Sequence, residues 1–156
     1  MEDAQVKFDS IDKVLDFAIE KEQEAADFYT ALAGKVKKSN MKDIFKQFSL
    51  EEQGHKAKLQ NVKKGKLELA GTKQKIADLK IAETVTDVVV DADFDYQQAL
   101  IVAMKAEKAA YKLYTDLADM AKDEKIVTIF KGLAQEEAKH KLRFETEYDE
   151  IVLKDN

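Results

Sequence analysis

The chain aligns with itself at a distance of 85 residues, without a gap. Between Ala18 and Lys56, 15 of 39 positions hold the same residue type as the position 85 residues later. The segment Tyr29-Thr-Ala-Leu-Ala33, for example, falls on Tyr114-Thr-Asp-Leu-Ala118. The period is too long for a solenoid of short repeats, and there are only two copies. We therefore expect one structural unit, a pair of helices, that is used twice, over residues 10–64 and 95–150 approximately.

The composition of the chain favours long helices. Proline is absent, there are only five glycines, and Ala, Glu, Lys, Leu and Asp are abundant. The expected helices run from about Ser10 to Lys38, from Ser39 to Lys64, from Asp95 to Lys122 and from Asp123 to Ile151. Their predicted end signals are Ser10 and Ser39-Asn40 as N-caps, the capping box Asp95-Tyr-Gln-Gln98, and Gly65 and Gly71 at a helix exit.

The lengths of the connections predict how these helices are arranged. The first and third links are short, so each pair of helices is expected to form an antiparallel αα-hairpin. The middle link has more than twenty residues, enough to carry the chain back along a bundle; Lys73 to Leu79 fits a short helix, and Val85 to Val90 an extended apolar strip. The predicted fold is an all-α four-helix bundle with one long crossover, as in ferritin-like folds. No stretch has the composition of a linker, so residues 1–156 are expected to form one domain.

Each predicted helix has a mainly apolar seam with a 4,3 spacing, and each seam is interrupted at mid-length by residues that can bind metals. The interruptions are Glu22 in the first helix, Glu52 and His55 in the second, Glu107 in the third, and Glu137 and His140 in the fourth. The two histidines are the only ones in the chain, and each ends a Glu-x-x-His motif whose two side chains share a helix face. The alternative is a solvated face with coincidental repetition, but the phase of the seam places these residues in the core.

Four glutamates in one core need compensation, because an unpaired buried carboxylate is strongly destabilising. Either the carboxylates take up protons or cations neutralise them. Two divalent cations would balance four carboxylates, with neutral imidazoles completing the two sets of ligands. Ala25 and Ala110, one turn beyond Glu22 and Glu107, would leave room for the metals. Carboxylate and imidazole ligands without thiolate suit iron or manganese, and less often zinc.

Other polar residues near these positions have two interpretations each. Tyr29 and Tyr114, two turns beyond Glu22 and Glu107, are either plain core residues or hydrogen-bond donors to a ligand carboxylate. Glu51 and Glu136 lie one position off the seam, where we expect surface side chains, with support of a ligand as the alternative. The lysines between Lys35 and Lys38 are expected at a solvated helix end.

Charge and composition exclude several classes of protein. The formal net charge of −5 argues against nucleic-acid binding, which needs a basic patch. Cysteine is absent, which excludes disulfides, thiolate zinc sites and iron–sulfur clusters. The acidic N-terminal segment has no apolar run behind it, as a signal peptide would, and no stretch is apolar enough to span a membrane. We therefore expect a cytoplasmic protein.

Together, Glu22 with the segment at Tyr29, Glu107 with the segment at Tyr114, and the two Glu-x-x-His motifs resemble the rubrerythrin-like branch of the ferritin-like superfamily. The resemblance covers about residues 10–150. It implies a non-haem di-iron centre that reduces peroxide or dioxygen in oxidative-stress defence, and a homodimer. The implied iron ligands are Glu22, Glu52, His55, Glu107, Glu137 and His140, with Glu52 and Glu137 bridging the two irons.

Two features of the chain depart from the family pattern. Full-length rubrerythrins have a cysteine-ligated iron domain that donates electrons; this chain has no cysteine, so the donor is expected to be a separate protein. Rubrerythrins also have an extra carboxylate one turn after the third-helix ligand, where this chain has Ala110. The predicted centre is therefore symmetric, like the six-ligand centre of bacterioferritin. The alternatives are ferroxidation with iron storage or delivery, and a metal-stabilised binding module.

Overall fold

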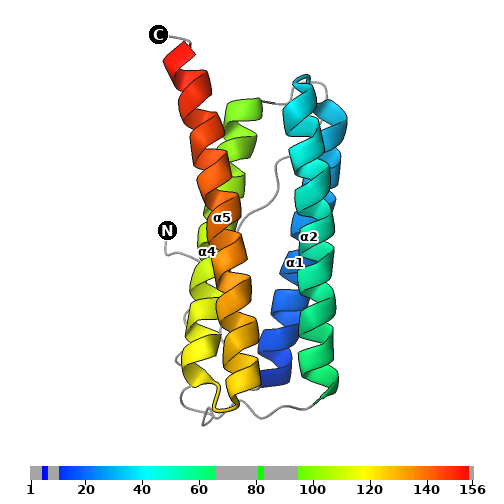
Figure 1. The fold of residues 1–156 in the computed structure, drawn as a ribbon, viewed down its shortest axis with the longest axis vertical. Helices are drawn as coiled ribbons and strands as arrows, with labels where there is room; N and C mark the ends of the chain where they lie inside the picture. Colours follow the sequence, from blue (N-terminus) through cyan, green and yellow to red (C-terminus); the bar gives the residue numbers. More distant parts are fainter. Residues whose placement is uncertain (1–4, 7–10, 66–80, 83–94, 155–156) are drawn as a thin grey trace.

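The computed structural model describes residues 5–6, 11–65, 81–82 and 95–154. This part of the chain contains four long helices (Figure 1): α1 (Ile11–Lys35), α2 (Ser39–Lys64), α4 (Tyr96–Met120) and α5 (Glu124–Lys154). Helices α1 and α2 pack along each other as one antiparallel hairpin, and α4 and α5 pack as the other. The predicted features at Ser10, Gly71, Lys73–Leu79 and Val85–Val90 lie outside the described residues.

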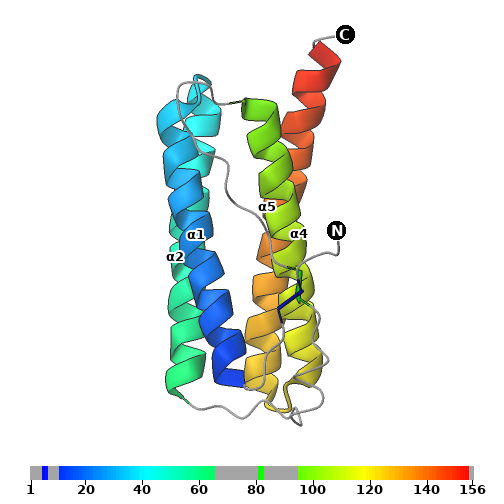
Figure 2. The same cartoon turned by 180° about the vertical axis from the view of Figure 1, so that it is seen from behind.

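The direction of the helices confirms the predicted bundle. Helices α2 and α4 run the same way in Figure 1, so the end of α2 and the start of α4 lie at opposite ends of the bundle. This is the all-α, ferritin-like arrangement with one long crossover. The sequence analysis did not foresee a short antiparallel strand pair, β1 (Gln5–Val6) with β2 (Ile81–Ala82), which lies beside α4 (Figure 2). Among the described residues, none of the helices is long and apolar enough to span a membrane.

The helix ends confirm one predicted cap and correct another. Asp95 caps α4, because its side chain accepts a hydrogen bond of 3.3 Å from the backbone N–H of Gln98. The predicted Ser39-Asn40 cap of α2 is wrong: Lys38 is the N-cap, without a side-chain cap hydrogen bond, and Ser39 is the first helical residue. Gly65 ends α2 as predicted, although its φ of −71° is one that any residue can adopt.

The core of the bundle is divided into two apolar clusters by a polar layer at mid-length. The aromatic cluster, toward the α1–α2 turn, includes Phe28, Tyr29, Phe45 and Phe144. The aliphatic cluster, toward the α4–α5 turn, is mainly Leu, Val, Ile and Ala, with Tyr114 and Phe130. Because the two clusters fix the helices on both sides of the polar layer, the residues of that layer are held in place from above and below.

Candidate metal centre

The polar layer consists of the six residues predicted from the sequence. The four helices bring them together as one buried set, with at most 2% of any member exposed; this set, called the central cluster below, is Glu22, Glu52, His55, Glu107, Glu137 and His140. Within it, donor atoms form two groups that overlap: one has Glu22 and His55, the other has Glu107 and His140, and both share Glu52 and Glu137. In each group, the donor atoms all lie within 4.8 Å of one another.

The Nδ1 atoms of the two histidines face the shared carboxylates. Nδ1 of His55 lies 2.9 Å from Oε1 of Glu137 and 3.6 Å from Oε2 of Glu22. Nδ1 of His140 lies 3.1 Å from Oε1 of Glu52 and 3.5 Å from Oε1 of Glu107. Each histidine therefore approaches a shared glutamate of the other hairpin. The grouping of Glu22 with His55 and of Glu107 with His140 is the one expected from the sequence.

Each residue of the central cluster has one buried donor atom that forms no well-aligned hydrogen bond, although several of these atoms face one another at short distances. These atoms are Oε2 of Glu22, Oε1 of Glu52, Nδ1 of His55, Oε2 of Glu107, Oε1 of Glu137 and Nδ1 of His140. A buried polar atom normally has a partner, since leaving it unsatisfied costs about 1–3 kcal/mol and more for a charged group. Six such atoms that converge from four helices fit cations at their centre, with oxygen and imidazole nitrogen as ligands.

Tyr29 and Tyr114 donate hydrogen bonds to carboxylates of the central cluster. The hydroxyl of Tyr29 on α1 donates to Oε1 of Glu107 on α4, and the hydroxyl of Tyr114 on α4 donates to Oε1 of Glu22 on α1. Both tyrosines are about 1% exposed, and burial followed by the neighbouring carboxylates raises their pKa well above the usual value. Each hydroxyl therefore stays protonated and holds one oxygen of its glutamate, leaving the other oxygen for a metal.

Glu51 and Glu136 support the histidines, which corrects the expectation that they are only surface residues. Nε2 of His55 contacts Oε2 of Glu136, and Nε2 of His140 lies 3.3 Å from Oε2 of Glu51. Both glutamate side chains remain partly exposed, Glu136 at 41% and Glu51 at 35%. Glu51 directly precedes Glu52 on α2, and Glu136 directly precedes Glu137 on α5. Each of these two helices therefore supplies the carboxylate that orients the imidazole of the other, with Nδ1 toward the cluster. The signal in the sequence was the repeated Glu-Glu pair, in register with the histidines.

The pKa shifts show how strongly the central cluster attracts positive charge. Burial lowers the pKa of His55, but the carboxylates around it, led by Glu22, raise it to about 9. Burial likewise lowers the pKa of His140, and Glu107 and Glu52 raise it to about 10. The pKa of Glu52 and Glu137 is raised well above the usual value, first by burial and then by neighbouring carboxylates. Without a metal, protons are thus the compensating charge, and metal binding must displace them.

A further buried glutamate, Glu147 on α5, provides a contrast within the same bundle. It is 0% exposed, and its Oε1 lies 2.8 Å from Nζ of Lys38, while Nη1 of Arg143 lies 4.0 Å from Oε2. Glu147 therefore has cationic side chains as partners, whereas the four glutamates of the central cluster contact histidines. Glu147 was not predicted from the sequence, although it is the next seam position after Phe144 in the same 4,3 spacing.

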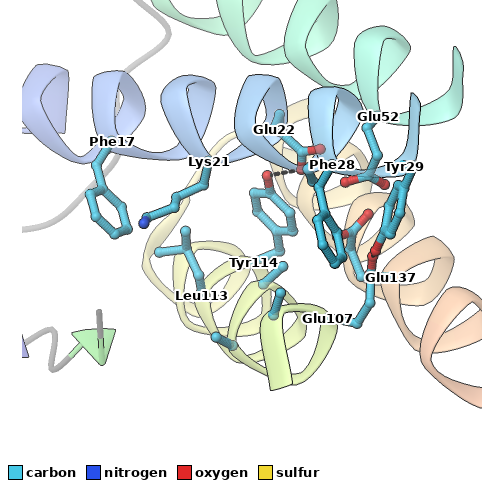
Figure 3. A pocket seen from close by; sticks show the side chains of 14 residues that line it. Phe17, Lys21, Glu22, Phe28, Tyr29, Glu52, Glu107, Leu113, Tyr114 and Glu137 are labelled. Atoms are coloured by element: carbon cyan, nitrogen blue, oxygen red, sulfur yellow. Dashed lines mark hydrogen bonds between the residues drawn. The ribbon is translucent and has the colours of Figure 1, made fainter. Parts of the chain in front are cut away.

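A small cavity reaches the central cluster from the side of α1 and α4 (Figure 3). The centre of a water molecule can occupy about 50 Å³ of this cavity. Its lining includes Glu22, Glu52, Glu107 and Glu137. Ala25 and Ala110 also line it, as expected from their small size and their place one turn beyond the glutamates. On the opposite side of the cluster, the two histidines and their supporting glutamates come from α2 and α5. The central cluster is therefore open on one side and supported on the other.

A family model described as Rubrerythrin matches residues 13–148 of the chain. The chain belongs to the rubrerythrin family. Its fold is similar to that of a hypothetical protein from Pyrococcus furiosus, with a TM-score of 0.76, 27% identity, and coverage of 90% of this chain and 89% of that one. It is also similar to the fold of a ferritin-like diiron-carboxylate protein from Thermotoga maritima, with a TM-score of 0.74, 18% identity, and coverage of 96% and 99%. No curated protein matches the chain significantly.

Membership of the rubrerythrin family and the geometry of the central cluster agree with each other. The family match spans all four helices that contribute to the cluster. At the position where the sequence comparison expected an additional carboxylate, Ala110 lines the cavity. This member of the rubrerythrin family therefore has a buried cluster of glutamates and histidines that can bind metal ions, with the same residue types in both halves.

Proposed function

We propose that the protein binds two iron ions in the central cluster and uses them to reduce peroxide or dioxygen. The observation that carries this proposal is the convergence of six buried donor atoms that form no well-aligned hydrogen bond, in two overlapping groups that share two carboxylates. Charge balance supports two divalent ions, because they would neutralise four carboxylates while both imidazoles stay neutral. Manganese suits the same donors, and zinc does so less often, so iron rests on the family membership as well.

In this proposal, each residue of the cluster has a distinct role. Glu52 and Glu137 would be ligands to both ions, because both belong to both groups. Glu22 with His55 completes one half, and Glu107 with His140 completes the other. Two ferrous ions held side by side can supply two electrons to one O–O bond. The surrounding chain orients the donors and keeps Tyr29 and Tyr114 protonated beside the reacting centre.

Other parts of the proposed function concern partners. The oxidised centre needs electrons, and the chain has no cysteine with which to bind an iron–sulfur or rubredoxin-like group, so we propose a separate electron-donor protein. A homodimer and a cytoplasmic location, with a role in oxidative-stress defence, complete the proposal by analogy with the family.

The experiment that tests the function is anaerobic loading with ferrous iron, followed by stoichiometric hydrogen peroxide. We expect about two irons per chain, a change in visible absorption when peroxide is added, and repeated turnover when a chemical reductant is supplied. A loaded protein whose absorption never changes with peroxide or dioxygen would contradict redox chemistry. That outcome would favour a metal-stabilised binding module instead.

Iron handling is the second candidate function, and the symmetry of the cluster favours it. Ala25 and Ala110 occupy equivalent places, so neither half has an additional carboxylate. A symmetric centre is suited to oxidising ferrous iron and passing it on, as in the bacterioferritin centre that the sequence resembles. Counting iron separates the two candidates: many more than two irons per chain in a large assembly would support storage.

A further inference from the structure

The cavity beside the central cluster has the dimensions of a site for a very small ligand. A buried water needs about 10–15 Å³ when volume is measured at the centre of the molecule. The roughly 50 Å³ measured in that way holds about three to five waters, or one molecule of a few heavy atoms. An organic substrate of ordinary size would need several times this space. The carboxylates of the cluster are part of the lining, so a bound molecule would lie beside them.

The internal repeat explains which residues create this space. Position 106 on α4 corresponds to position 21 on α1, and position 109 corresponds to position 24. Helix α1 has Lys21 and Glu24 at these places, whereas α4 has Ala106 and Ala109, both of which line the cavity. The donor residues of the two helices are identical, but the side chains beside the donors are long on α1 and short on α4. Ala106 and Ala109 are therefore the residues whose small size leaves the cavity open.

The walls of the cavity determine the kind of molecule that fits. Beyond the cluster, the lining is mainly apolar, with Phe17, Phe28 and Leu113 beside the alanines. Lys21 is the one cationic residue among the lining side chains (Figure 3); its Nζ lies 3.1 Å from Oε2 of Glu24 and 5.4 Å from the ring centre of Phe17. Lys21 and Glu24 balance each other in charge, so this part of the wall favours neither cations nor anions. An anion entering here would lose hydration and meet the carboxylates of the central cluster, so the cavity favours an uncharged molecule over an anion.

We propose that this cavity is the binding site through which a small uncharged oxidant reaches the metal centre, and that Ala106 and Ala109 set its size limit. The proposal rests on the proposed function in one respect, namely that metals occupy the central cluster. It goes further in assigning the α1–α4 side to the oxidant and in naming two residues outside the donor set as its specificity determinants.

The test fills the cavity without changing a donor. Ala106→Leu and Ala109→Leu are compared with the parent and with Ala31→Leu, a control at an exposed position on α1. Each protein is loaded with ferrous iron without oxygen and mixed rapidly with nitric oxide, an uncharged diatomic probe. We expect equal iron contents and a rate of nitric oxide binding that falls about tenfold or more in both cavity variants, with Ala31→Leu unchanged.

Two further measurements keep the test decisive if the leucine variants fold poorly. Ala106→Val adds only two methyl groups and is expected to slow nitric oxide binding by a smaller factor at full helicity. Crystals of the zinc-loaded parent, pressurised with xenon, are expected to show a xenon atom between α1 and α4, because apolar cavities bind xenon. That atom should be missing in Ala106→Leu.

The outcomes separate this inference from the proposed function. Nitric oxide binding at the parent rate in well-folded Leu variants, or xenon binding that is unaffected by Ala106→Leu, would overturn the cavity as the access site. In that case the metal centre and its reaction would still stand. If the parent binds nitric oxide through the cavity but reduces neither peroxide nor dioxygen, the proposed reaction fails and the binding site remains.

Discussion

The two helical hairpins provide identical donors to the central cluster but surround them differently. Glu22, Glu52 and His55 of the first hairpin match Glu107, Glu137 and His140 of the second in type, burial and spacing. The neighbours diverge: the ring of Phe48 stacks on His140 at 4.0 Å between ring centres, and the repeat-related position holds Leu133. On the other side, Lys21 corresponds to Ala106. The comparison indicates that the chemistry of the cluster fixes the donors, while packing leaves their surroundings free to differ.

The largest expected effect comes from removing the histidine that each hairpin contributes to the central cluster. The double substitution His55→Ala and His140→Ala deletes one donor from each half, and we expect metal content to fall from about two per chain to near zero. The helices should persist, because both apolar clusters are untouched. Elemental analysis with far-UV circular dichroism checks both expectations. Metal content equal to that of the parent would contradict the assignment of the cluster.

A smaller effect is expected when one half is changed at a time. Glu22→Ala removes a donor from the group with His55 and leaves the group with His140 complete. We expect about one metal per chain at limiting concentration, and the mirror result for Glu107→Ala. Titration with manganese, followed by electron paramagnetic resonance, distinguishes single from paired ions. If either variant loses both ions or neither, the halves are not independent in the way that the two groups indicate.

Changing a supporting glutamate should weaken binding without abolishing it. Glu136→Gln removes a charge from the partner of His55, and Glu51→Gln does the same for His140. Residues that orient a metal-binding histidine typically contribute a factor of about 10–100 in affinity. We expect metal affinity to fall by that factor in each variant. The loss should affect the half of the cluster whose histidine has lost its partner. Lys64→Gln, an exposed change at the end of α2, is the control and should leave affinity unchanged.

The smallest difference between the halves concerns protons in the metal-free protein. Because the chain has only two histidines, both can be followed by NMR, and we expect His55 to titrate near pH 9 and His140 near pH 10. Both values exceed the unperturbed 6.5 of the unfolded chain, so their stabilising contribution is complete below pH 6.5 and is lost as the pH rises through 9 and 10.

The raised pKa values of Glu52 and Glu137 act in the same direction, because these groups also bind protons more tightly in the folded state. The melting temperature of the metal-free protein should therefore decrease from pH 6.5 to pH 10. The melting temperature of the manganese-loaded protein should decrease less, since metal replaces the protons. Equal slopes with and without metal would show that the cluster does not exchange protons for metal.

The residues of the central cluster and the two hairpins could be predicted from the sequence, because both are repeated with a helical period. Glu147 shows where that reasoning was too narrow: it lies on the same seam, but it has no counterpart in a metal-binding motif and is neutralised by Lys38. Glu51 and Glu136 were placed one position off the seam, and their contacts depend on the distance between α2 and α5. A spacing along one helix carries no information about that distance.

Other features could not be predicted from the sequence, because they depend on tertiary contacts. A hydrogen bond to a carboxylate was one of two interpretations for the tyrosines, and the helix spacing did not reveal that Tyr29 crosses to Glu107 and Tyr114 to Glu22. The N-cap at Lys38 was missed because Ser and Asn at the next two positions are stronger capping residues. The side chain of Lys38 instead reaches Glu147, a contact between residues 109 positions apart. The capping propensity of a residue does not include such a long-range contact.

Anomalous diffraction from crystals of the iron-loaded protein can show directly whether the central cluster holds two iron ions. We expect two iron peaks per chain, roughly 3.5–4 Å apart, with Glu52 and Glu137 bound to both. One peak should lie at Nδ1 of His55 with Glu22, and the other at Nδ1 of His140 with Glu107. A single peak, or peaks away from these six residues, would contradict the proposed site.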